Sequence, residues 1–288
     1  MEGNNMKLGV ISDCFKRPMK ESIEMAASLG IDGIQMYAVS GDICPENLTK
    51  DGIAYYKKVL RDCNLSVSAL CGDLGGHGFE LAKDNVWKIE KTKKIVDLAC
   101  EFETSVVTTH IGVIPDDVSC EKYSVMVNAL RECSAYAHAH GVTLAVETGP
   151  ETAPVLHGFI ENVGNGLGVN LDPANFVMVT GQDPAEAVRL MGKHIVHTHM
   201  KDGKMLRRSD PVEIYGYFAD GGIEALNIAD FFIETPVGEG DVNWDEYIAT
   251  LRSVGYNGYL TVERETGSDP AADIRKAVDF AKAHGWHL

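Results

Sequence analysis

Three histidines, two lysines and an aspartate lie in the segment KHIVHTHMKDG, residues 193–203. Apolar or β-branched residues separate the histidines, so the segment predicts a β-strand that runs into a glycine turn. Because successive side chains of a strand point to opposite faces, His197 and His199 share one face and His194 lies on the other. Imidazoles beside charged residues at a strand end can bind a metal ion or transfer protons. One buried structural histidine and two surface ones would give the same pattern.

Short apolar runs like this one recur along the chain at intervals of roughly 25–40 residues, which is typical of strands joined by helices. The predicted strands are 7–13, 31–38, 65–73, 104–110, 142–147, 166–172, 194–202 and 258–265. Amphipathic helical patterns separate them, and several end on a glycine, as a helix C-cap favours. The clearest helical patterns are 19–30, 84–102, 123–141, 244–255 and 269–285.

Eight strands that alternate with eight helical patterns predict a parallel sheet with helical crossovers. Eight such units in one chain indicate an α/β fold of the (β/α)₈ TIM barrel type, as a single domain over residues 1–288. A doubly wound open sheet is the alternative, but VISDCFKRP after the first strand lacks its glycine-rich phosphate turn. The longest connection runs over 203–242, and a loop of that length in a compact domain is commonly functional.

The composition excludes several classes of partner. The chain has 288 residues with 26 basic and 42 acidic side chains, and its net charge of −16 disfavours nucleic acid and anionic membranes. Neither a membrane-spanning run nor a signal-peptide pattern occurs in the sequence, so we expect a cytoplasmic protein. The seven cysteines form no CxxC pair and are expected to be reduced thiols.

The polar residues that close the predicted strands carry the strongest chemical signal. In a barrel of this kind the carboxyl ends of the strands meet at the active-site face. The fifth to eighth strands end in Glu147, Asp172, His199 and Glu263. One imidazole with three carboxylates is an oxygen-rich ligand set that suits Mn²⁺, Mg²⁺ or Co²⁺. The sequence therefore predicts a metal site at this face.

A family resemblance lies in the same places. Several motifs resemble the xylose isomerase-like barrels, a sugar phosphate isomerase and epimerase group that includes ketose 3-epimerases, inosose dehydratases and endonuclease IV. These motifs are AVETG (145–149), GVNLDPANF (168–176), HTHMKDG (197–203), PVGEGDVNW (236–244) and GYLTVERE (258–265). The resemblance runs over the whole chain. It implies one bound divalent metal, Mn²⁺ foremost with Mg²⁺, Co²⁺ or Zn²⁺ also compatible, held by Glu147, Asp172, His199 and Glu263.

The resemblance implies a different role for each histidine of the segment 193–203. His199 is the implied ligand, His197 is expected to be a packed, hydrogen-bonded barrel residue, and His194 is expected to have neither role. The endonuclease members carry further ligands for a three-metal cluster, and one of those positions is Asn175 here. His110 remains at the end of the fourth strand. A single metal beside one extra histidine fits substrate binding better than phosphodiester cleavage.

The resemblance implies an isomerase or epimerase that moves a proton next to a ketose carbonyl through an enediolate. Glu147 and Glu263 would then act as base and acid on the two faces of that intermediate. A dehydratase or lyase on a keto-sugar or inosose would use the same residues and expel a β-hydroxyl. A third hypothesis is a metal-binding barrel subunit that is active only with a partner.

The substrate contacts are predicted less directly. His110 and Asn175 are candidate hydrogen-bond partners for sugar hydroxyls, and Asp73, with Gln35 and the glycine-rich loop 75–79, is a candidate for the mouth of the pocket. Ordinary loop polarity is the alternative for these mouth residues.

Whether the substrate carries a phosphate depends on the segment 203–242. Its Arg207, beside Arg208, could hold a phosphate through guanidinium groups, but the acidic segment ETGSDPAAD (265–273) after the last strand would repel one. We therefore expect a small unphosphorylated sugar or cyclitol as the partner. The segment 203–242 would serve as a lid or as a contact in a homo-oligomer.

Overall fold

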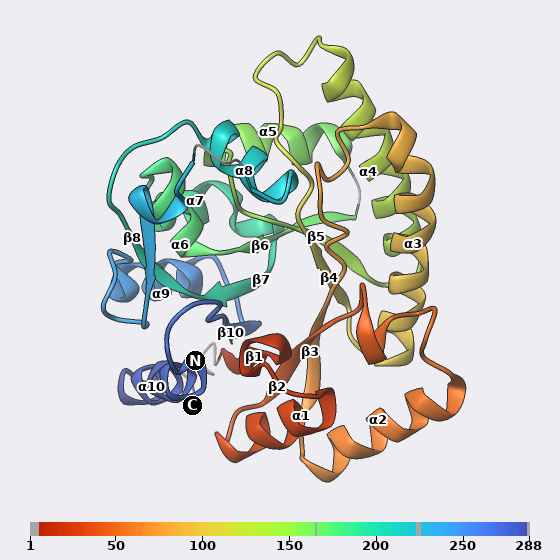
Figure 1. Ribbon diagram of the computed structural model, residues 1–288, viewed down its shortest axis with the longest axis vertical. Coiled ribbons are helices and arrows are strands. Elements are labelled where there is room, and N and C mark those ends of the chain that lie inside the picture. Colours follow the sequence, from red (N-terminus) through yellow and green to blue (C-terminus); the bar gives the residue numbers. More distant parts are fainter. Residues whose placement is uncertain (1–5, 165, 223–225, 287–288) are drawn as a thin grey trace.

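A computed structural model describes residues 6–164, 166–222 and 226–286. Eight parallel strands close into a barrel in the order β1-β10-β7-β6-β5-β4-β3-β2, which confirms the predicted fold class (Figure 1). Every barrel strand lies within one of the predicted strand ranges. The barrel strands are β1 (Lys7–Ile11), β2 (Gly33–Tyr37), β3 (Ser66–Cys71), β4 (Val106–Thr109), β5 (Thr143–Glu147), β6 (Leu167–Leu171), β7 (Ile195–Met200) and β10 (Tyr259–Val262).

Eight helices follow the barrel strands and surround them (Figure 1). They are α1 (Met19–Ser28), α2 (Lys50–Asp62), α3 (Ala82–Glu101), α4 (Glu121–Ala139), α5 (Ala153–Val163), α7 (Pro184–Met191), α9 (Trp244–Ser253) and α10 (Pro270–Ala283). Helix α10 illustrates why they form. Ile274 and, one turn later, the neighbouring Ala277 and Val278 lie on the same face of the helix and are buried. Asp269 caps its N-terminus by accepting a hydrogen bond from the Ala272 amide.

Shorter elements connect these units. The 3₁₀ turns are Ser12–Phe15, Gly41–Ile43, Gly192–His194 and Ile228–Asp230. After β6 the chain forms the one-turn helix α6 (Pro173–Asn175), which continues into a π-helical turn at Phe176–Thr180.

The segment expected as one long loop, 203–242, contains regular structure. Strands β8 (Asp202–Met205) and β9 (Phe232–Thr235) pair antiparallel in a separate two-stranded sheet, and α8 (Pro211–Ala219) lies between them. Each of the two strands has only four residues, too few for a periodic pattern to stand out in the sequence. Residues 223–225 of this segment lie outside the described residues.

The register of the barrel aligns the polar residues in layers. Glu147 on β5 pairs with Asn170 on β6, and Asn170 pairs with His197 on β7. On the other side of β7, His199 pairs with Thr261 on β10. Side chains alternate along each strand, so residues two positions apart on one strand point to the same side. The residues named above, and the residue two positions after each of them, therefore point into the barrel interior.

Two features of the described ranges complete the fold. Among their helices, none has both the length and the apolar character that a membrane span requires. All seven cysteines fall within these ranges as free thiols.

Candidate metal centre

The four residues that close β5, β6, β7 and β10 converge at one end of the barrel. Glu147, Asp172, His199 and Glu263 are buried, and one potential ligand atom from each lies within 4.8 Å of the others. His199 Nδ1 is at the centre of the group. It lies 3.0 Å from Glu263 Oε2, 3.3 Å from Glu147 Oε1 and 3.9 Å from Asp172 Oδ2. The structure thus brings together the four residues that the strand ends predicted.

Asp172 and His199 each use one polar side-chain atom in hydrogen bonds or close polar contacts and have a second atom, a potential metal ligand, that faces this group. Asp172 Oδ1 caps α6 by accepting hydrogen bonds from the amides of Ala174, at 2.8 Å, and Asn175. His199 Nε2 lies 3.1 Å from the side-chain amide oxygen of Gln35, so in the neutral ring the proton is assigned to Nε2 and the lone pair to Nδ1. Within the described part of the chain, Asp172 Oδ2 and His199 Nδ1 are buried without a hydrogen-bond partner.

Buried polar atoms without partners are rare and call for an explanation. Two such atoms here belong to a set of one imidazole and three carboxylates, which is the donor set of a divalent cation. The residues present therefore fit a divalent metal, and Gln35 would orient the imidazole ligand from behind.

The charges in the cluster support the same interpretation. Burial disfavours a charged imidazole, yet Glu147 and Glu263 hold the pKa of His199 well above its usual value. Burial likewise opposes the anion of Glu147, but His199 and His110 lower the pKa of this carboxyl. The pocket is thus built to hold positive charge at the position of His199 Nδ1.

His197 belongs to the layer beneath the ligands. Its Nδ1 donates to Asn170 Oδ1 at 2.8 Å, and its Nε2 accepts from the Thr261 hydroxyl at 2.9 Å. Burial and the neighbouring His199 hold the pKa of His197 well below its usual value, so the ring stays neutral. Asn170 in turn donates to Glu147 Oε2 at 3.2 Å and fixes that carboxylate. The expected packed and hydrogen-bonded role of His197 is confirmed.

Lys201 was not assigned a role from the sequence, although it belongs to the site. Its buried ammonium lies 2.7 Å from Glu265 Oε2, 3.3 Å from Glu263 Oε2 and 3.8 Å from Asp172 Oδ2. The signal was available in the sequence, because Lys201 follows His199 by two positions and therefore points to the same face. Burial disfavours the ammonium, but Glu263 and Glu265 hold the pKa of Lys201 well above its usual value.

The turn before α9 is held by Asp202. Its carboxylate accepts hydrogen bonds from the amides of Gly238 and Val242 and from the indole of Trp244. A Cβ atom at Gly240 would lie 1.9 Å from Asp202 Oδ1, so only glycine fits there. Asp202 thereby ties the far end of the segment 203–242 to the end of β7.

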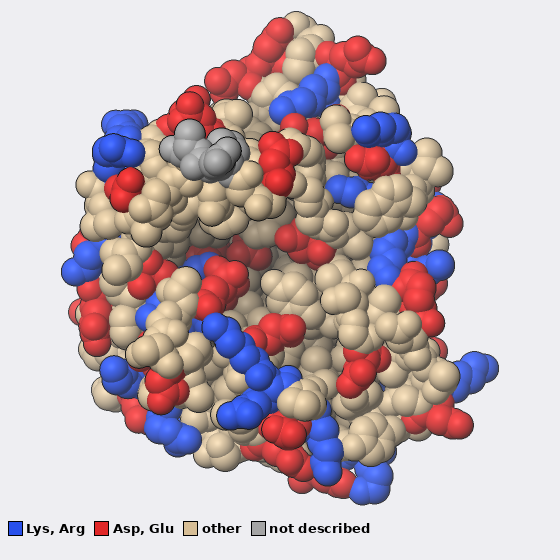
Figure 2. Space-filling view, viewed as in Figure 1, with Lys and Arg blue, Asp and Glu red and all other residues tan. Residues whose placement is uncertain are grey.

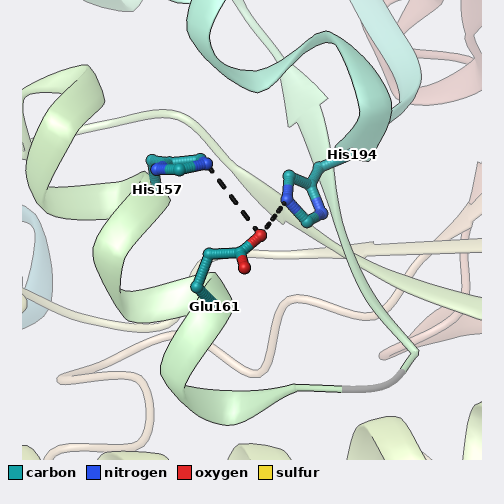
Figure 3. A group of neighbouring side chains, drawn as sticks. All are labelled: His157, Glu161 and His194. Carbon is teal, nitrogen blue, oxygen red and sulfur yellow. Dashed lines mark hydrogen bonds and ion pairs between the residues drawn. The ribbon is translucent and has the colours of Figure 1, made fainter.

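A second cluster of possible ligands lies away from this site, near the beginning of β7. His157 and His194 both point towards the carboxylate of Glu161 on α5 (Figure 3), with Nε2 atoms 3.9 Å and 2.7 Å from Glu161 Oε1. The ammonium of Lys193 contacts the same oxygen at 2.9 Å and already neutralises it. Because this carboxylate is paired and half exposed, the buried cluster is the better metal site.

The buried cluster opens into a cavity of about 950 Å³, visible in Figure 2 as a central hollow with acidic side chains inside it. His110, Asn175 and Asp73, the candidate substrate contacts, are among the residues that line this cavity. His110 Nε2 lies 3.8 Å from Glu147 Oε1, which places it beside the metal centre. The Asn175 amide donates to the carbonyl of Thr148, and Asp73 Oδ1 accepts from the Gly75 amide.

Arg207 lies apart from these residues. Its side chain is exposed, its guanidinium is 4.2 Å from the ring centroid of Phe231, and it is not among the residues that line the cavity. Gln35, expected at the mouth, instead lies buried behind His199. The aromatic residues of α8, in contrast, form a wall of the cavity.

Comparison with known proteins assigns the class. The family model for the xylose isomerase-like TIM barrel matches residues 23–284, and the chain belongs to this family. The resemblance inferred from the sequence motifs is thereby confirmed.

Two curated proteins and one solved structure are among those that the chain resembles. The chain is 24% identical to the uncharacterized protein YfiH of Bacillus subtilis, over 96% of this chain and 98% of that protein. It is 39% identical to the L-ribulose-5-phosphate 3-epimerase UlaE of Escherichia coli, but over only 69 residues, 22% of this chain and 24% of the epimerase. The crystal structure of AsbF from Bacillus anthracis, a probable 3-DHS dehydratase, superposes with a TM-score of 0.74 at 20% identity, covering 96% of this chain and 99% of AsbF.

Proposed function

We propose that this protein is a divalent-metal-dependent sugar isomerase or epimerase that moves a proton at the carbon next to a ketose carbonyl through an enediolate. The observation that carries this proposal is the buried group of three carboxylates and one imidazole, with two unpartnered ligand atoms, at the base of a large cavity. The likeness to a sugar epimerase supports it at the level of the family.

A bound divalent ion would act as a Lewis acid that acidifies the carbon next to the carbonyl and stabilises the enediolate. Glu147, Asp172, His199 and Glu263 would hold it. The remaining task, moving the proton, falls to the two glutamates, which come from β5 and β10 on either side of β6 and β7.

The surroundings of the two glutamates keep both ionised, but through different neighbours. Burial opposes the anion of Glu263, but Lys201 and His199 lower the pKa of this carboxyl, so Glu263 is ionised and can accept the substrate proton. Burial also opposes a charged His110, but Glu147 and Asp73 raise its pKa. His110 lies 3.8 Å from Glu147 Oε1 and can supply the proton that Glu147 returns to the other face.

A dehydratase or lyase is the second candidate, and one observation favours it. Lys201 and His110 both line the cavity, and a protonated group there could protonate a departing hydroxyl. The likeness to the AsbF dehydratase is compatible with this chemistry. Whether the substrate carries a β-hydroxyl in a position to leave separates the two candidates.

The charges around the cavity favour an unphosphorylated sugar or cyclitol. Each basic side chain of the lining already lies beside a carboxylate, including His110 beside Glu147. Lys122 contacts Glu80 at 2.7 Å, Lys201 contacts Glu265 at 2.7 Å, and His77 contacts Asp220 at 2.9 Å. The lining also includes further carboxylates, namely Asp73, Glu147, Glu234 and Glu263. Two of these carboxylates are proposed metal ligands, and Glu234 is paired with Arg264. Among the described residues that line the cavity, every lysine already has an acidic partner, so none is free to bind an anionic phosphate.

The experiment that tests the proposal measures deuterium incorporation from D₂O into a panel of ketoses, ketose phosphates and inososes. Metal-loaded protein should exchange the proton next to the carbonyl of at least one unphosphorylated substrate. Glu147→Gln and Glu263→Gln should each lower that rate by about 10²-fold or more, with an unchanged circular dichroism spectrum. His194→Ala, in the cluster on α5, is the matched control and should exchange at the wild-type rate. Wild-type exchange by both glutamine variants would exclude the mechanism.

A further inference from the structure

The cavity is larger than the proposed reaction requires. Its volume of about 950 Å³ is near the upper end of the range for drug-sized ligands, roughly 300–1,000 Å³. A single monosaccharide next to the metal centre would fill only part of this space. The remainder must hold water or another portion of the substrate.

The part of the cavity away from the metal centre has a distinct composition. We call it the apolar half, and it is formed by the π-helical turn after β6 together with α8 and β9. Its principal side chains are Met178, Ile214, Tyr215, Phe218, Phe232 and Ile233. Met178 and Val179 pack with Tyr215 and Phe232 in a small apolar cluster that is separate from the barrel core.

A row of aromatic rings connects the metal centre to the apolar half. The ring of His110, beside Glu147, lies 6.2 Å from that of Tyr215. The Tyr215 ring lies 6.4 Å from Phe218, whose ring lies 5.5 Å from that of Tyr217, both in edge-to-face orientation. Such rings offer both faces and edges to a further aromatic group. The two halves of the cavity are therefore continuous.

The Tyr215 end of this row is held close to the catalytic strand ends. A Cβ atom at Gly149 would lie 2.5 Å from the Tyr215 hydroxyl, so this glycine allows Tyr215 to approach β5. Further out, Phe218 is 57% exposed, Val212 55% and Ile233 49%. Large apolar side chains that gather around a cavity at such exposure are typical of a binding surface.

We propose that the apolar half is a subsite for an aromatic aglycone, so that the protein acts on the sugar ring of a keto-glycoside. The sugar ring lies at the metal centre, and the aglycone lies against Tyr215, Phe218 and Ile233. This inference rests on the proposed function, which places the reacting carbon. A second sugar ring is a poorer occupant, because its several hydroxyls need polar partners and, of the principal side chains of this half, only Tyr215 carries a polar group.

The test measures binding without turnover. Dissociation constants are determined by isothermal titration calorimetry for matched phenyl and methyl β-glycosides of glucose, galactose and xylose, with metal-loaded and with EDTA-treated protein. In at least one pair the phenyl glycoside should bind about tenfold or more tightly than the methyl glycoside, as burial of an aromatic ring predicts. Methyl β-cellobioside should gain no comparable affinity.

Variants locate the effect. Phe218→Ala combined with Ile233→Ala should remove most of the phenyl advantage, and both side chains are exposed enough for the fold to survive. The matched control is Trp87→Ala, which removes an exposed aromatic residue on α3 outside the cavity. This variant should leave the phenyl advantage unchanged. Equal affinities within all three pairs, an advantage that persists in the double variant, or a cellobioside that binds as tightly as the phenyl glucoside would each overturn the proposal. Since binding is measured without reaction, a failure here is distinct from a failure of deuterium exchange.

Discussion

Asp172→Asn separates the two functions that the structure gives to this carboxylate. Oδ1 caps α6 through the amides of Ala174 and Asn175, while Oδ2 is buried, without a hydrogen-bond partner, and faces the other three proposed ligands. Asparagine keeps an oxygen for the cap but places an amide nitrogen, which is not a metal ligand, at the second position. The variant should therefore fold normally and fail to bind the metal.

The magnitude follows from mass action. A metal at a hundred times its dissociation constant stabilises the protein that binds it by about 2.7 kcal/mol. For a chain of 288 residues that corresponds to an increase in Tm of roughly 4–5 °C. Asp172→Asn should show no such increase. Asp172→Ala should lack it as well and should also be less stable without metal by about 1 kcal/mol, because it loses the helix cap.

The assay is thermal unfolding in EDTA and in excess Mn²⁺, followed by circular dichroism. His194→Ala serves as the control and should retain the full metal-dependent increase, because it removes the exposed cluster on α5 without touching the buried one. An equal increase for wild type and Asp172→Asn would refute the assignment of Asp172 as a ligand. An increase that disappears in His194→Ala would place the metal at the other cluster.

Three further predictions concern stability. In EDTA, the free energy of unfolding should fall as pH rises from 6.5, the ordinary pKa of histidine, through the raised pKa of His199, since deprotonation ends its attraction to Glu147 and Glu263. Urea titrations should show this fall in wild type and a smaller one in His199→Gln, where His110, whose pKa Glu147 and Asp73 also raise, remains. Gly240→Ala should lower Tm by several degrees because its Cβ would overlap Asp202. Gly158→Ala, exposed in α5 with no atom near the new Cβ, should instead raise the unfolding free energy by up to about 1 kcal/mol in the same scans.

The barrel strands and the four proposed metal ligands could be predicted from the sequence because both depend on local periodicity. Each barrel strand is an apolar run bounded by polar residues, and the alternation of side chains fixes which residues of a strand share a face. His197 and His199 were thus placed on one face, and Glu147, Asp172 and Glu263 at strand ends. Once the alternation of strands and helices indicates a parallel barrel, all such ends must meet.

The surroundings of the ligands were decided only by the tertiary structure. Gln35 meets His199 across 164 positions of the chain, and no local pattern signals such a pair. The short strands β8 and β9 became recognisable only through their mutual pairing, which carries α8 to the cavity and turns Arg207 onto Phe231. Periodicity along the chain thus determined which side chains face inward. The contacts between distant segments, which depend on how elements pack rather than on local spacing, determined the second wall of the cavity and the partners of each ligand.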